Sequence, residues 1–170
     1  MTDGLRLFFA LPCPPAEAER ITAWRNSLAR QPGRSVAQDN LHVTLAFLGR
    51  QPAARLASLR TLAGALRTEP FELRLERLGL TAGGVLWLEP SDAPAALLQL
   101  ATGLREALAE AGVDYDRQEF RPHLTLYRQA DARPEGASPV LAWQVDRFAL
   151  YHSQDTAAGV RYRSLADWPI

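Results

Sequence analysis

The chain has 170 residues, of which 47% are hydrophobic and 22% charged, so it can bury a core of its own and does not have the composition of a disordered protein. Its formal net charge of +0 excludes a strong overall field that would attract a long nucleic acid or a membrane surface. The single cysteine, Cys13, excludes an intrachain disulfide and a cysteine metal cluster. We therefore expect a single globular domain over residues 1–170.

The sequence contains no segment of about 18 consecutive apolar residues, which a membrane-spanning helix would need. Residues 1–4 lack the basic and then apolar layout of a signal peptide. We expect a cytoplasmic protein, monomeric and without contact with a membrane.

The first half of the chain predicts strands and helices in alternation. An apolar run over 5–11 predicts a buried strand, and Pro14 and Pro15 open a helix that ends at 31–33. Residues 41–49 predict a second strand. Leucines at helical spacing then predict a helix that begins at Pro52. The alternation of apolar and charged residues over 71–80 predicts one half-exposed strand.

The second half repeats this order. A turn at Gly83–Gly84 leads into a strand over 85–89, and Ser91 or Asp92 is expected to cap a third helix that Gly112 ends. The remaining predicted strands cover 119–128, 140–151 and 160–165.

Two units of strand, helix and histidine-bearing strand follow one another. Leu5 and Val85, which begin the two units, lie 80 residues apart, and His42 and His123 lie 81 apart. The matched spacing suggests two related lobes around a pseudo-twofold axis, with the two histidines facing one another across a cleft.

Two of the three histidines occupy nearly identical His-x-Thr motifs, at 41–45 and 122–126, whereas His152 has no threonine two residues later. Residues i and i+2 of a strand point to the same face, so each motif presents an imidazole and a hydroxyl together. Two such strands side by side would surround one small site with two imidazoles and two hydroxyls. His152 is expected to lie at a strand end, away from this site.

A site of this kind suits displacement at the phosphorus of a phosphodiester. One histidine near its ordinary pKa removes a proton from the attacking oxygen, and the other donates a proton to the leaving oxygen. The threonine hydroxyls donate to the non-bridging oxygens. Other interpretations remain open, because single histidines are often buried structural residues and zinc also binds histidine. We favour the catalytic interpretation, which requires no metal and no cofactor.

The motifs resemble the paired signatures of the 2H phosphoesterase superfamily, in particular those of the RNA 2′,3′-cyclic phosphodiesterases, also called 2′-5′ RNA ligases. The similar segments are 40–49 and 120–128, together with 6–10 and 159–169. The resemblance implies a bilobal α+β fold in which each of two pseudo-symmetric lobes has an antiparallel sheet and outer helices, with the active site in the cleft between them.

The resemblance also implies hydrolysis of a terminal 2′,3′-cyclic phosphate, on RNA or a nucleotide, to a 2′-phosphate. His123 is implied to be the proton acceptor that activates water, and His42 the proton donor to the departing 3′ oxygen. Thr44 and Thr125 are implied to hold the phosphate. The motifs are nearly symmetric, so the sequence by itself does not set this direction.

Arg128 and Phe47, each five residues past a motif histidine, match a phosphate-contacting arginine and a base-stacking aromatic of that family. Strict alternation places them on the face opposite the histidines, so both require a bulge, a twist or a strand end to reach the cleft. Tyr127 shares the face of His123 in a regular strand and is expected to line the pocket. Trp24, Trp87 and Trp143 are expected in the core.

Two rival functions remain. The reverse reaction would join RNA ends through a 2′-5′ linkage, because one site can catalyse both directions. A non-catalytic module that binds nucleotides or RNA ends is the alternative from another class, although both histidines and both threonines are present.

Overall fold

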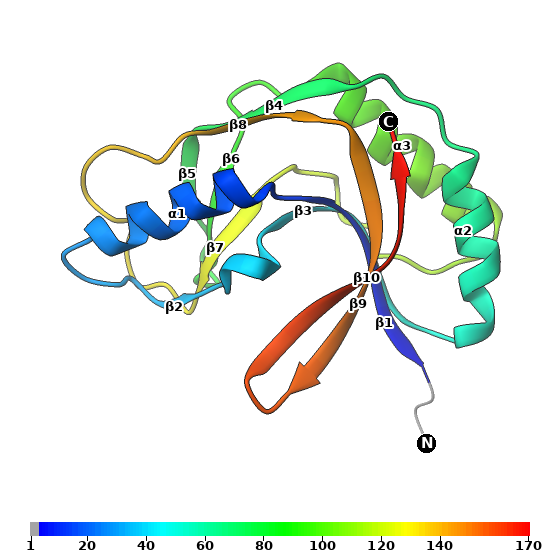
Figure 1. Ribbon diagram of the computed structural model, residues 1–170, viewed down its shortest axis with the longest axis horizontal. Helices are drawn as coiled ribbons and strands as arrows, with labels where there is room; N and C mark the ends of the chain where they lie inside the picture. Colours follow the sequence, from blue (N-terminus) through cyan, green and yellow to red (C-terminus); the bar gives the residue numbers. More distant parts are fainter. Residues whose placement is uncertain (1–3) are drawn as a thin grey trace.

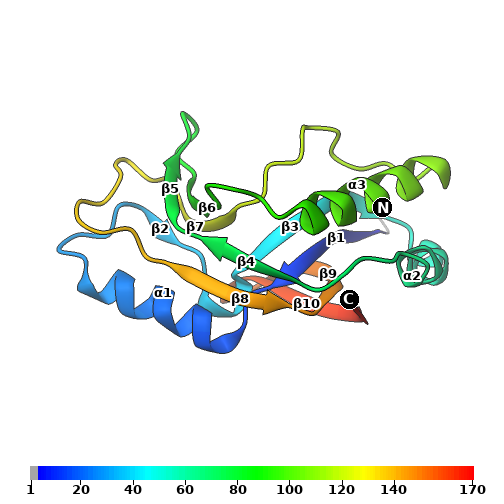
Figure 2. The same ribbon diagram turned by 90° about the horizontal axis from the view of Figure 1, so that it is seen from above.

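The structure, a computed structural model, describes residues 4–170. It is an α+β fold that contains an eight-stranded and a two-stranded antiparallel sheet (Figure 1). The large sheet has the order β10-β9-β1-β3-β7-β6-β5 with β2 paired to β7, and the small sheet joins β4 to β8. In both views α1 lies at one end of the molecule and α2 and α3 lie at the other (Figures 1 and 2).

The strands are β1 (Leu5–Pro12), β2 (Arg34–Ser35), β3 (His42–Gln51), β4 (Phe71–Leu75), β5 (Arg77–Leu80), β6 (Leu86–Glu89), β7 (Leu124–Arg128), β8 (Leu141–Val145), β9 (Arg147–Thr156) and β10 (Gly159–Pro169). The α-helices are α1 (Pro15–Ser27), α2 (Leu56–Gly64) and α3 (Ala95–Glu110), and short 3-10 turns cover Gln38–Asn40 and Ala53–Arg55.

The predicted repeat corresponds to the units β1-α1-β3 and β6-α3-β7. The two strands within each unit pair with one another in antiparallel fashion. The units join where β3 meets β7, through the single residue pair Val43 and Leu124. The large sheet therefore runs continuously through both halves of the molecule, so the halves share one sheet.

One face of the large sheet packs into the core. Val43, Leu45, Leu124 and Leu126 have no accessible surface and belong to a single apolar cluster. That cluster also contains Ile21 of α1 and parts of α3, β4 and β8. Each buried leucine or valine stabilises the fold by about 2 kcal/mol relative to an exposed one. The opposite face of β3 and β7 is left free of the core, and the histidines lie there.

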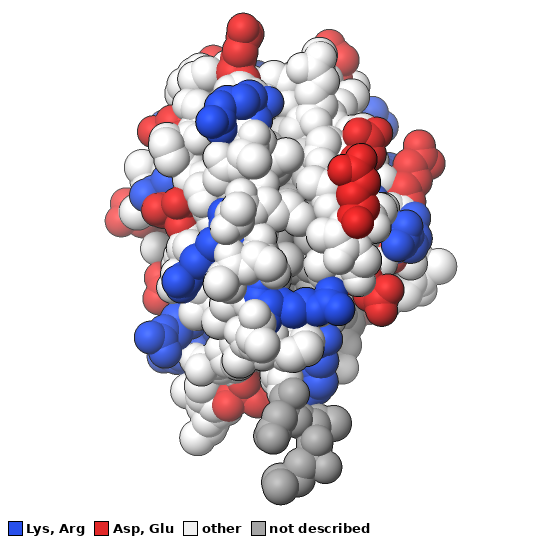
Figure 3. Space-filling model, turned by 90° about the vertical axis from the view of Figure 1, so that its right-hand side faces the viewer, with Lys and Arg blue, Asp and Glu red and all other residues white. Residues whose placement is uncertain are grey.

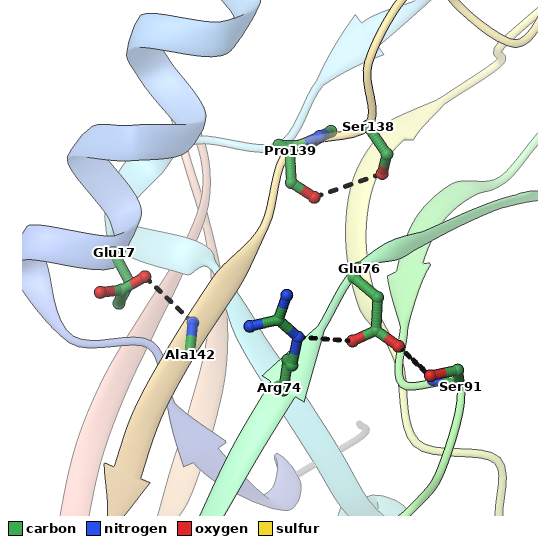
Figure 4. A network of polar contacts seen from close by, with 7 residues as sticks. All are labelled: Glu17, Arg74, Glu76, Ser91, Ser138, Pro139 and Ala142. Carbon is green, nitrogen blue, oxygen red and sulfur yellow. Dashed lines mark hydrogen bonds and ion pairs between the residues drawn. The ribbon is translucent and has the colours of Figure 1, made fainter.

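Two predicted strands are each divided between the two sheets. The strand predicted over 71–80 breaks at Glu76 into β4 and β5, and the strand predicted over 140–151 breaks at Asp146 into β8 and β9. In each case the chain leaves the small sheet and enters the large one. The α1 carboxylate of Glu17 accepts a hydrogen bond from the Ala142 N–H, which ties the helix to β8 (Figure 4).

Ser91 does not cap α3, contrary to the prediction. The helix begins after Pro94 without a side-chain cap. The Ser91 N–H instead donates to Glu76 Oε1 at 2.7 Å, its hydroxyl donates to the same carboxylate, and Arg74 lies 3.7 Å from the other oxygen (Figure 4). Ser91 thus holds the corner between β4 and β5.

Further boundaries differ from the predictions. α1 ends at Ser27, before the predicted end at 31–33, and the strand predicted over 119–128 begins only at Leu124. β10 extends beyond 165 to Pro169, and a 3-10 turn precedes α2. In residues 4–170, none of the helices has the length and apolar character to cross a membrane.

On the face in Figure 3 arginines and acidic residues are interspersed, in keeping with the neutral net charge.

Candidate active site

The two His-x-Thr motifs meet at the junction of β3 and β7. Because Val43 pairs with Leu124 in an antiparallel ladder, His42 lies opposite Thr125 and Thr44 lies opposite His123. Opposed residues of antiparallel strands are about 5 Å apart between Cα atoms. Val43 and Leu124 face the core, so these four neighbours face the other way. The structure thus brings the four predicted residues together on one face.

Both imidazoles are oriented by main-chain carbonyls. His42 Nδ1 lies 2.6 Å from the Asn40 carbonyl oxygen, and His123 Nδ1 lies 2.7 Å from that of Arg121. A carbonyl oxygen only accepts, so each Nδ1 carries the hydrogen and each neutral ring keeps an unprotonated Nε2. The Thr44 hydroxyl donates to His42 Nε2 over 2.9 Å. Both motifs therefore fix the same tautomer.

The surroundings of His42 favour its neutral form. The pKa of His42 is lowered from 6.5 to about 4, chiefly by burial; the hydrogen bond to Asn40 opposes this shift, and the positive charges of His123 and Arg128 contribute to it. The burial comes from aromatic rings, with Phe8 and Tyr162 at 5.0 and 5.2 Å between ring centroids.

Burial also lowers the pKa of His123, and Arg121 and Arg128 act in the same direction. The hydrogen bond to the Arg121 carbonyl and the carboxylate of Glu89 oppose that shift. The two histidines and Arg128 are therefore electrostatically coupled within one site.

A bulge in β3 turns Phe47 towards the histidine face. Against β1, Thr44 and Ala46 pair with adjacent residues, which leaves Leu45 without a counterpart. An extra residue inverts the alternation of the strand beyond it. Ala46 is buried accordingly, and Phe47 is 36% exposed and joins the face of His42. Of the bulge, twist or strand end that the prediction allowed, the structure has a bulge.

β7 contains a bulge of the same kind. Against β6, Thr125 and Tyr127 pair with adjacent residues, so Leu126 has no partner in the β6–β7 ladder. Beyond this bulge Arg128 is exposed on the histidine face, close enough for its charge to lower the pKa of both His42 and His123.

Tyr127 was predicted to line the pocket, but the structure places it in the core. Its side chain has no accessible surface, and its hydroxyl donates to Gln31 Oε1 at 2.5 Å. Arg25 lies over its ring at 5.2 Å. The bulge at Leu126 explains the difference, because it exchanges the faces of Tyr127 and Arg128.

Each bulge is supported by an arginine from the helix of the other unit. Arg105 of α3 donates to the Leu45 carbonyl over 3.1 Å, and Arg25 of α1 donates to the Leu126 carbonyl over 2.8 Å. The Leu126 carbonyl also accepts the Val36 N–H over 2.9 Å, so Arg25 is its second donor, and each arginine fixes the bulged backbone from outside the β1–β3 or β6–β7 ladder. Arg25 and Arg105 lie 80 residues apart, and only the repeat could have indicated them from sequence.

A cavity of about 530 Å³ adjoins the site, a size suited to a small ligand. Thr44, Phe47, Trp87, Phe120 and His123 are among the residues that line it. The cavity therefore places aromatic side chains beside the histidine face.

The sequence predicted Trp87 in the core, but the structure places it in the lining of this cavity. Its ring centroid is 4.3 Å from that of His123. Its Nε1–H donates to Glu89 Oε2 over 3.1 Å, and Arg121 makes two hydrogen bonds to the same carboxylate at 2.9 and 3.1 Å. A Cβ on Gly79 would lie 2.5 Å from Trp87 Nε1, so only glycine leaves room for the indole in this position.

His152 and Cys13 lie outside the cluster. His152 lies within β9, paired with Leu7 and Arg163, instead of at a strand end. Burial raises the pKa of the Cys13 thiol to about 12, which disfavours a nucleophilic role. Within residues 4–170, no three His, Cys, Asp or Glu side chains gather in a way that could hold a metal ion.

The sequence profile of the 2′-5′ RNA ligase superfamily matches residues 12–157. The RNA 2′,3′-cyclic phosphodiesterase of Escherichia coli (strain K12) is 37% identical over 174 residues, which cover all of this chain and 99% of the relative. That of Thermus thermophilus is 33% identical, over 98% of this chain and 90% of the relative.

The crystal structure of E. coli LigT complexed with 3′-AMP superposes with a TM-score of 0.91 at 37% identity and covers 98% of both chains. The chain therefore belongs to the 2′-5′ RNA ligase superfamily and, within it, to the family of RNA 2′,3′-cyclic phosphodiesterases.

Proposed function

We propose that this protein hydrolyses the terminal 2′,3′-cyclic phosphate of RNA, or of a nucleotide, to a 2′-phosphate by acid-base catalysis without a metal ion. The observation that carries the proposal is the arrangement of two imidazoles and two hydroxyls on one face, each imidazole with Nδ1 bound to a carbonyl. The activity named for the E. coli and Thermus relatives supports the choice of substrate.

In the proposed reaction His123 Nε2 accepts a proton from water, whose oxygen forms a bond to phosphorus. The bond between phosphorus and the 3′ oxygen breaks, and His42 donates a proton to that oxygen, so the 2′-phosphate remains. The resemblance to the family supplies this direction. Because each Nδ1–H stays bound to a carbonyl, proton transfer takes place at Nε2 alone.

Substrate binding itself would prepare His42 to act as the acid. The free protein favours neutral His42, with a pKa of about 4. A phosphodiester anion beside the ring favours the charged form and raises that pKa. Once His42 Nε2 carries a proton, the Thr44 hydroxyl no longer donates to it. Thr44, Thr125 and Arg128 then stabilise the charge that develops on the non-bridging oxygens.

The cavity next to the site is suited to the terminal nucleoside. Phe47 and Trp87 present aromatic surfaces on which a base can stack, and stacking contributes about 1–3 kcal/mol per base. We propose that the cyclic phosphate lies at the junction of β3 and β7, in a cleft between the two halves of the molecule.

The test is incubation with adenosine 2′,3′-cyclic phosphate and with a short RNA bearing a cyclic end, each with and without EDTA, followed by phosphorus NMR to identify the product. We expect a 2′-phosphate at rates that EDTA does not change. His42→Ala and His123→Ala should each reduce kcat by at least about 10²-fold, whereas the matched control His152→Ala should not. Absence of turnover by the wild type, or an active single variant, refutes the proposal.

The reverse reaction is the second candidate, because the same proton donor and acceptor can act in both directions and the superfamily is described as one of 2′-5′ RNA ligases. RNA carrying a cyclic end and RNA carrying a 5′-hydroxyl would then give a 2′-5′-linked product. Tight binding of both RNAs without any reaction would instead indicate a non-catalytic module that binds RNA ends.

A further inference from the structure

Two arginines lie directly opposite one another beside the site. In the β2–β7 pair Arg34 is the partner of Arg128, and both side chains are exposed. Opposed residues of antiparallel strands project to the same face, and like charges in this position repel one another. Within residues 4–170, no carboxylate lies within 4 Å of either guanidinium. An anion between the two would relieve the repulsion.

Arg34 and Arg128 line a second cavity, of about 310 Å³. Asn40 and Tyr162 also line it, and both contact His42, Asn40 through its carbonyl and Tyr162 through its ring. The tip of the β9–β10 hairpin also lines this cavity, and the Val160 carbonyl accepts a hydrogen bond of 2.8 Å from the Asn40 side chain.

The two cavities have no lining residue in common. The larger contains Phe47, Trp87 and His123, and the smaller contains the arginine pair and the residues around His42. Arg128 links them, because its charge reaches both histidines while its side chain lines the smaller cavity. An anion bound to Arg34 would therefore lie next to a phosphate held at the histidines, on the side of that phosphate where Arg128 lies.

We propose that Arg34 forms a second phosphate subsite, which binds the phosphate on the 5′ side of the terminal nucleoside and shares Arg128 with the cyclic phosphate at the histidines. This inference rests on the proposed function and specifies its substrate class: RNA ends of two or more nucleotides, in preference to cyclic mononucleotides. The terminal ribose connects the two phosphates covalently. With the cyclic phosphate at the histidines and the base in the larger cavity, the 5′ phosphate is left to face the smaller one.

Three substrates test the proposal: adenosine 2′,3′-cyclic phosphate, its 5′-phosphorylated form, and the dinucleotide ApA with a 2′,3′-cyclic end. In the wild type we expect kcat/KM about tenfold higher for the second and third than for the first, since a charge-assisted hydrogen bond to an exposed phosphate is worth about one factor of ten. If the dinucleotide gains and the 5′-phosphorylated mononucleotide does not, a second nucleoside is recognised instead, and the proposal is wrong.

Variants of Arg34 separate the subsite from a structural role. Arg34→Gln should reduce the ratio of kcat/KM for the dinucleotide over the mononucleotide about tenfold, and Arg34→Lys, which keeps the charge, should retain most of it. The matched control Arg67→Gln removes an exposed arginine beyond the end of α2 and should leave the ratio unchanged. An equal loss on both substrates, or an unchanged ratio in Arg34→Gln, overturns the proposal.

Failure of the proposed function gives a different result. If the wild type hydrolyses none of the three compounds, their dissociation constants are measured directly by calorimetry, because the ligands are not consumed. Tighter binding of the two compounds with a 5′ phosphate, lost in Arg34→Gln, would support the subsite in a protein that only binds RNA ends. Equal affinity for all three compounds would refute the subsite whether or not the protein is catalytic.

Discussion

The substitution His42→Asn should change how the stability of the protein depends on pH. An asparagine places Nδ2 near the position of the imidazole Nδ1, so a donor to the Asn40 carbonyl is retained while the titrating group is removed. In the folded wild type the pKa of His42 is about 4, whereas the ordinary value of 6.5 applies to the unfolded chain. Below pH 6.5 the unfolded state therefore takes up a proton that the folded state refuses.

The sign follows from linkage. Stability from this group is fully present above pH 6.5 and declines as the pH falls to about 4, below which both states are protonated. A difference of this size between the two states lowers the free energy of unfolding by about 2 kcal/mol between pH 7 and pH 5. The figure is an upper bound, because His42 as a residue is only partly buried.

The assay is urea denaturation of wild type and His42→Asn at several pH values from 4 to 8. The difference between their unfolding free energies should move by about 1–2 kcal/mol in favour of the variant as the pH falls from 7 to 5. His152→Asn, which removes a histidine of β9, is the matched control. Parallel pH curves for wild type and His42→Asn would refute the conclusion that His42 is held neutral.

The remaining predictions concern catalysis and the supports of the site. The pKa values of His42 and His123 are both lowered from 6.5, so the singly protonated pair of histidines is most populated below pH 6.5. Above pH 6.5, kcat/KM should therefore fall about tenfold per pH unit. An optimum of kcat/KM above about pH 7.5 would contradict this prediction. Gly79→Ala should displace Trp87 from His123, change the tryptophan fluorescence and lower kcat/KM at least about tenfold. Arg105→Met should leave a bulge carbonyl without this donor, lower the free energy of unfolding by about 1–2 kcal/mol and raise KM more than it lowers kcat.

Matched controls exist for both structural variants. A Cβ on Gly83 meets nothing closer than 3.8 Å, so Gly83→Ala should leave the fluorescence and kcat/KM as they are. Arg67→Met removes an exposed arginine remote from the bulges and should leave KM unchanged. Equal effects in a variant and its control would show that the change is not specific to Trp87 or to the bulge.

The histidine and threonine positions could be predicted because alternation along a strand depends on local sequence alone. Val43 and Leu124 are apolar, so their neighbours had to occupy the opposite face. The faces of Phe47 and Tyr127 could not be predicted with the same certainty. They depend on an extra residue at each bulge, and a bulge is defined by the register with a partner strand that is distant in sequence.

The division of two predicted strands between the small and the large sheet was not predicted, for a related reason. Alternation changes phase after Glu76, where Arg77 follows and Leu78 and Leu80 take the other face, but only the structure shows that the chain passes there from one sheet to the other. Trp87 looked like a core residue because its neighbours are apolar, whereas its room beside His123 depends on Gly79 in the adjoining strand. The sequence gives no reason to single out Arg34, because its position opposite Arg128 depends on the pairing of β2 with β7.

The two carbonyls that orient the imidazoles make the tautomer of His42 and His123 independent of side-chain identity at the positions that supply the carbonyls. Any amino acid at position 40 or 121 supplies the same carbonyl, so point mutation at these positions leaves the acceptor in place provided the backbone path is kept. Enzymes that orient histidine with a carboxylate side chain lose this control through one codon change. Here the backbone conformation alone keeps the hydrogen on Nδ1 of both histidines. The same tautomer should therefore persist in relatives whose side chains at these two positions have diverged.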